Sequence, residues 1–75
     1  MLPDKLVYMA NQVAKFFAHE GEAKAVTDTA DHLVKFWDPR MRAAILKHLD
    51  EGGAGLDPIP LKAVQVLKER ASASA

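Results

Sequence analysis

The dipeptide Asp-Pro occurs twice in this chain, at Asp38-Pro39 and at Asp57-Pro58, and it strongly restricts where helices can begin. An Asp at the N-cap can accept hydrogen bonds from the free backbone N–H groups of the first helical turn. Proline suits the first helical position, where its nitrogen needs no hydrogen bond. Because a residue before a proline avoids helical backbone angles, a preceding helix should end by Trp37. The two corners therefore divide the chain into separate helical segments.

Along the whole chain, apolar residues recur at spacings of three and four, which is the period of an amphipathic helix. The stripe of the first segment consists of Leu6, Met9, Ala10, Val13, Phe16 and Phe17. The fourth segment has apolar residues on more than one face, so it should lie deep in the fold or dock on another chain. The pattern predicts helices near residues 4–19, 22–37, 39–51 and 58–70. We expect an all-α fold, a small compact bundle of about four short helices.

Glycines and small residues mark the expected connections. Gly21 fits a C-terminal cap, and Gly52-Gly53 should end the third helix. Gly55 should keep the following connector loose. We expect residues 1–70 to form a single helical domain and residues 71–75, Ala-Ser-Ala-Ser-Ala, to form a flexible C-terminal tail.

Size and composition exclude several classes of protein. The 75 residues contain no cysteine, so a disulfide scaffold, an iron–sulfur site and a thiolate zinc site are excluded. A core this small is thin, and we expect the isolated chain to be marginally stable or self-associated, as a homo-oligomer. The zero net charge gives no broad field for nucleic acid or an anionic membrane. With neither a signal peptide nor a membrane span in the sequence, we expect a cytoplasmic protein.

The sequence offers little for chemistry. His19, His32 and His48 lie on three different segments, and no histidine pair has the spacing of a zinc-protease helix. Thr29 and Asp28 could each contact His32 on one helix, but a nucleophile also needs oxyanion donors. We therefore predict no catalytic, cofactor-binding or metal-binding residue in this chain.

The corner Phe36-Trp37-Asp38-Pro39-Arg40-Met41-Arg42 is the best candidate for a contact surface. Trp and Arg often dominate protein interfaces, so we predict partner binding by Trp37, Arg40, Met41 and Arg42. In the competing interpretation, Phe36 and Trp37 close a small core and the arginines lie in water. A third interpretation, a DNA-binding helix-turn-helix, conflicts with the abrupt corner and the neutral charge.

Four sequence blocks carry a resemblance to a known family: residues 5–12 (Lys-Leu-Val-Tyr-Met-Ala-Asn-Gln), Phe16-Phe17, residues 36–42 and Gly55-Leu56-Asp57-Pro58. Their order and spacing resemble the delta subunit of NAD-dependent formate dehydrogenase from about residue 5 to residue 67. The resemblance implies a cytoplasmic enzyme complex that oxidises formate to carbon dioxide and reduces NAD.

In such a complex, the partner subunits would carry a molybdenum or tungsten bis-pterin guanine dinucleotide centre, iron–sulfur clusters and FMN. This chain would bind no cofactor. The resemblance implies a non-catalytic accessory subunit that contacts the large catalytic subunits and assists assembly, stability or metal-cofactor maturation. The alternative that the residues leave open is a free-standing helical binding module, such as a small DNA-binding or regulatory protein.

Overall fold

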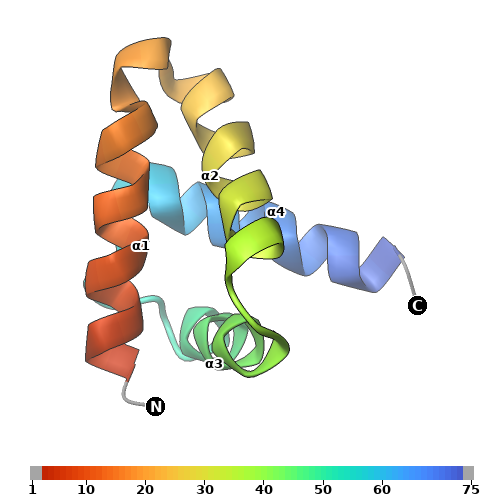
Figure 1. Cartoon of the computed structure of the whole chain (residues 1–75). Coiled ribbons are helices and arrows are strands. Elements are labelled where there is room, and N and C mark those ends of the chain that lie inside the picture. Colours follow the sequence, from red (N-terminus) through yellow and green to blue (C-terminus); the bar gives the residue numbers. More distant parts are fainter. Residues whose placement is uncertain (1–2, 74–75) are drawn as a thin grey trace.

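The computed structural model describes residues 3–73, and this part of the chain is helical without any strand. The elements are α1 (Pro3–Phe17), the short 3-10 helix η1 (Ala18–Glu20), α2 (Glu22–Phe36), α3 (Pro39–Asp50) and α4 (Pro58–Ala73). Helices α1 and α2 form a hairpin, α4 crosses behind it, and α3 lies across its open end (Figure 1). The expectation of an all-α bundle of about four short helices is confirmed.

Both Asp-Pro corners start a helix, as the sequence predicts. Asp38 has extended backbone angles, and its Oδ1 accepts a hydrogen bond of 2.9 Å from the backbone N–H of Met41. This is the side-chain cap that an N-cap Asp is expected to make. At the second corner, the backbone N–H of Leu61 donates to the carbonyl oxygen of Asp57 at 2.9 Å, which closes the first turn of α4.

Helix α4 is longer than the sequence predicts. It continues through Ala73, so residues 71–73, which we expected in a flexible tail, are helical. Alanine is the best helix former, and alternating it with serine does not break a helix that is already started. The rest of the expected tail, residues 74–75, lies outside the described residues.

The core is a single cluster to which all four α-helices contribute. Its members include the fully buried Leu6, Leu33, Ile45 and Val64, one from each helix. Trp37, which is 5% exposed, belongs to the same cluster and closes it where α2 meets α3. Along α4 the buried residues follow one regular stripe, Pro60, Ala63, Val64 and Leu67.

The connector between α3 and α4 is fixed in place, which corrects the expectation of a loose linker. The side chain of Asn11 in α1 donates to the carbonyl oxygen of Gly55 at 3.0 Å and accepts from the backbone N–H of Asp57 at 3.0 Å. His48 Nε2 donates to the carbonyl oxygen of Ala54 at 2.7 Å. A Cβ at Gly53, where φ is +66°, would lie 2.9 Å from a methyl carbon of Leu61. Glycine therefore serves close packing here.

Candidate protein-docking surface

A row of aromatic rings lies on the outside of the α1–α2 hairpin. The rings of Phe16 and Phe17 meet edge to face at 5.1 Å between centroids, Phe17 and His32 are 6.3 Å apart, and His32 and Phe36 are 4.6 Å apart. Phe16 is 73% exposed and Phe36 is 66% exposed. Single exposed apolar residues are common on soluble proteins, but a contiguous group of large rings is typical of an interaction site.

The position of Phe16 follows from how α1 is turned against the core. The residues of α1 that are buried are Leu6, Val7, Ala10 and Ala14. Leu6 and Ala10 belong to the predicted apolar stripe, whereas Val7 and Ala14 lie beside it. Phe16 lies on the other side of the stripe, with Val13 half-buried between them. The stripe on α1 is therefore wider than the surface that the chain's own core covers, and its uncovered part carries the rings.

The rings line two open hollows that together we call the aromatic groove. One hollow measures about 370 Å³ and is lined by Gln12, Val13, Phe16, Phe17 and His32. The other measures about 230 Å³ and is lined by Phe17, Asp28, Asp31, His32, Lys35 and Phe36. Because Phe17 and His32 border both hollows, the two form one continuous surface.

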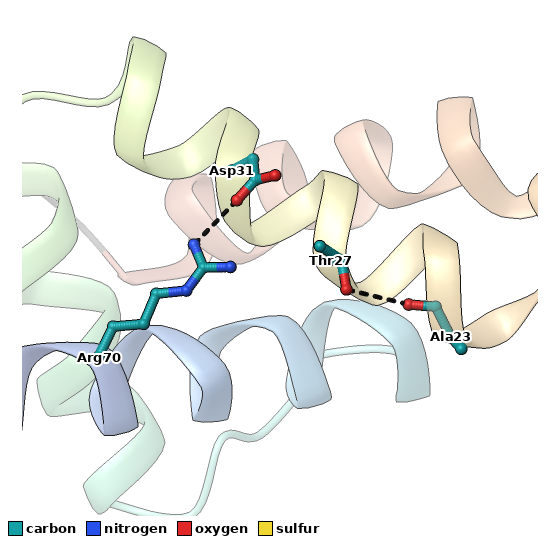
Figure 2. Close-up of polar contacts among 4 residues, drawn as sticks. All are labelled: Ala23, Thr27, Asp31 and Arg70. Atoms are coloured by element: carbon teal, nitrogen blue, oxygen red, sulfur yellow. Dashed lines mark hydrogen bonds and ion pairs between the residues drawn. The ribbon is translucent and has the colours of Figure 1, made fainter. Parts of the chain in front are cut away.

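Charged side chains border the groove on α2. The ammonium of Lys35 lies 5.9 Å from the centroid of the Phe36 ring, a cation–π distance. The carboxylate of Asp31 accepts from Arg70 of α4 at 2.9 Å, and Figure 2 shows this pair joining the two helices. The carboxylate of Asp31 is therefore already paired with a cation of this chain. Within α2, the hydroxyl of Thr27 donates to the carbonyl oxygen of Ala23 at 3.3 Å (Figure 2).

Asp28, which lines the second hollow, is paired differently. Its carboxyl group hydrogen-bonds that of Glu20, and this bond raises the pKa of Asp28 and lowers the pKa of Glu20. Such a bond exists only while one of the two carboxyl groups holds a proton. Glu20 Oε1 is buried and has no donor of its own, whereas Oε2 accepts from Lys24 at 3.4 Å. The charge of Lys24 acts on both carboxyl groups and opposes the rise in the pKa of Asp28.

Three of the four residues predicted for partner binding make contacts within this chain. Trp37 lies in the core, and Met41 is half-buried and packs against it. Arg42 donates through Nη1 to the carbonyl oxygen of Val34 at 3.2 Å and to that of Trp37. These carbonyl groups lie at the end of α2, where helical partners run out, so Arg42 caps that helix.

Arg40 differs from these three because it is exposed on the first turn of α3. Phe36, three residues before Pro39, is the exposed aromatic residue of the corner. It has the surface exposure that we predicted for Trp37, which is buried. The spacing of Asp28, His32 and Phe36, four residues apart on one helix, is the signal that could have indicated the groove.

Among residues 3–73, no three or more His, Asp or Glu side chains come together in a group that could hold a metal ion. Two of the three histidines have separate local roles: His32 lies between two aromatic rings, and His48 donates a hydrogen bond to the α3–α4 connector. None of the helices within the described range combines the length and the apolar character that crossing a membrane requires.

The chain was compared with protein families, curated proteins and solved structures. The model of a family described as the NADH-dependent formate dehydrogenase delta subunit matches residues 5–64. This range includes the aromatic groove, the corner and the α3–α4 connector. No curated protein matches the chain. No solved structure matches it either.

Proposed function

The chain belongs to the family of NADH-dependent formate dehydrogenase delta subunits, and from this membership we propose that it is a non-catalytic accessory subunit of that enzyme. In this proposal it assists assembly, stability or metal-cofactor maturation of the complex in the cytoplasm. It acts through contacts with the large catalytic subunits. The molybdenum or tungsten centre, the iron–sulfur clusters and FMN would all be held by those subunits.

The observation that carries the proposal is the exposed row of rings from Phe16 to Phe36. Aromatic side chains bury a large area with few rotatable bonds, which makes them frequent anchors in protein interfaces. Leaving such a surface in water favours association with another protein. A subunit whose role is to bind other subunits needs a surface of this kind.

For the corner, we propose that Arg40 contacts a partner together with Phe36, since both are exposed. Trp37, Met41 and Arg42 would support that contact indirectly, because they fix the angle between α2 and α3. An arginine offers forked donors that suit a carboxylate on the facing subunit. Arg40→Ala should weaken binding to the complex without changing the helical content.

The test is deletion of this chain from an organism that makes the enzyme. We expect lower formate dehydrogenase activity, with reduced metal content per catalytic subunit or a complex that dissociates more readily. Adding back the chain during expression should restore the lost property. A complex purified without the chain that has full metal content, full stability and full turnover would refute the proposal.

A further inference from the structure

We propose that residues 68–73, the last turns of α4, form an electrostatically fastened strap that closes one side of an apolar hollow and opens as the ionic strength rises. The hollow measures about 280 Å³ and is lined by Val34, Arg42, Leu46, Leu67, Arg70 and Ala71. The strap is a conformational device of this chain itself, and its opening does not depend on the accessory function proposed above.

The strap differs from the rest of α4 in its burial. Within the described range, Leu67 is the last buried residue of α4, and every residue from 68 to 73 is exposed. In Figure 1 the C-terminal end of α4 projects past the α1–α2 hairpin. Tertiary packing of an apolar face supplies most of the stability of a helix in a protein. The earlier turns of α4 are therefore held by the core, whereas the strap depends on other contacts.

Ion pairs tie the strap to two neighbouring helices. Lys68 Nζ lies 2.5 Å from Oδ1 of Asp50 at the end of α3, and Arg70 Nη1 lies 2.9 Å from Oδ1 of Asp31 in α2 (Figure 2). Residues two positions apart project from nearly opposite sides of a helix, so the two pairs fasten the strap to α3 and to α2. All four side chains are about half exposed, and salt screens ion pairs between such groups.

The closed and frayed forms of the strap are close in free energy. An exposed ion pair typically shifts an equilibrium by no more than about fivefold, and helix ends are among the first parts of a protein to open. In the closed form, Arg70 and Ala71 form one wall of the hollow, with Val34 and Leu46 opposite. Fraying removes that wall and exposes more of these two apolar side chains to water.

The first experiment measures the helical fraction of the strap in the full chain from backbone Cα chemical shifts. The ratio of helical to frayed strap should fall about two- to tenfold between about 0.01 M and about 1 M NaCl, since the Debye length shrinks from about 30 Å to about 3 Å. The double variant Asp31→Asn/Asp50→Asn should already show the lower ratio at low salt. It should change little when salt is added.

The acids are changed, and not the cations, for a physical reason. Lys68 and Arg70 lie near the C-terminus of α4, where a positive charge also interacts favourably with the helix dipole, and salt screens that interaction too. The double variant keeps both cations, so any salt dependence that it retains comes from the dipole. The difference between the two chains then reports the ion pairs. If the double variant is as helical as the wild-type strap at low salt, the inference is wrong.

Glu22→Gln is the matched control. Glu22 of α2 lies 2.8 Å from Lys62, which is also in α4 but precedes Leu67, in the part of the helix that the core holds. Removing this pair should leave the helical fraction of the strap unchanged at both salt concentrations. If Glu22→Gln opens the strap as far as the double variant does, ion pairs act through the stability of the whole fold, which would contradict a separate strap.

A second experiment tests whether the strap closes the hollow. Because the chain contains no cysteine, Val34→Cys places a single thiol in the hollow, at a position that is 49% exposed. At low salt, its reaction with N-ethylmaleimide should be about two- to fivefold faster in the double variant than in the chain with both acids. Tyr8→Cys, on the exposed side of α1, should react at one rate in both. Equal rates for Val34→Cys in the two chains would overturn the inference.

Discussion

Asn11 provides the sharpest test of how the α3–α4 connector is held, and we expect Asn11→Ala to lower the free energy of unfolding by about 1–3 kcal/mol. Its amide makes two hydrogen bonds, to the carbonyl oxygen of Gly55 and from the N–H of Asp57, each 3.0 Å long. A net contribution of about 0.5–1.5 kcal/mol for each bond gives the stated range. The lower half is the better expectation, because both bonds are partly accessible to water.

A second variant separates the two bonds. Asn11→Asp keeps the acceptor for the Asp57 N–H but replaces the donor to Gly55 with a carboxylate oxygen, so it should lose the bond to Gly55 and add repulsion. Gln12→Ala is the control, because Gln12 is the exposed neighbour on the same helix. Urea-induced unfolding followed by circular dichroism gives the free energies of the three variants.

Hydrogen exchange measured by NMR reports the local effect. The amide proton of Asp57 is bonded to Asn11, so its exchange should accelerate strongly in Asn11→Ala and little in Asn11→Asp. The reasoning is refuted if Asn11→Ala unfolds at the same urea concentration as Gln12→Ala and the Asp57 amide exchanges at the wild-type rate. In that case, packing alone would hold the connector.

Four further outcomes follow from individual contacts. Arg42→Ala should lower the free energy of unfolding by about 1–3 kcal/mol, measured in urea, because two carbonyl groups at the end of α2 lose their donor. Trp37→Ala should cost about 3–5 kcal/mol in the same assay, since it empties an aromatic core site. Thr29→Val should raise the melting temperature, because the buried Thr29 hydroxyl has no partner among the described residues. Because the pKa of Asp28 is raised, its contribution to stability is present at low pH and is lost as the pH rises through that pKa. Asp28→Asn should therefore be at least as stable as the wild-type chain at pH 7. Thermal unfolding measured from pH 4 to 8 tests this.

The helices could be predicted from the sequence because their signals are local. The side chain of Asp38 caps α3 through a backbone N–H three residues away, and a glycine or proline stands at or beside the starts of α2, α3 and α4. The fixed connector could not be predicted in this way. Asn11 and Gly55 are 44 positions apart, so nothing near Gly55 in the sequence indicates that its carbonyl oxygen has a donor. The glycines indicate only that the backbone can turn. Whether the connector is held in place depends on contacts with residues far away in the sequence, such as Asn11.

The aromatic groove could not be predicted from the sequence for a related reason. A stripe with six apolar residues on α1 is wide enough to face the core in more than one rotation, and the sequence alone does not choose between them. The structure turns the small side chains Ala10 and Ala14 inward, where they allow close packing, and this turns Phe16 outward. A side chain that is 73% exposed contributes little to folding, so a polar residue at position 16 would serve the fold equally well. The aromatic residue there exceeds what folding requires, and this excess supports the proposed contact with a partner subunit.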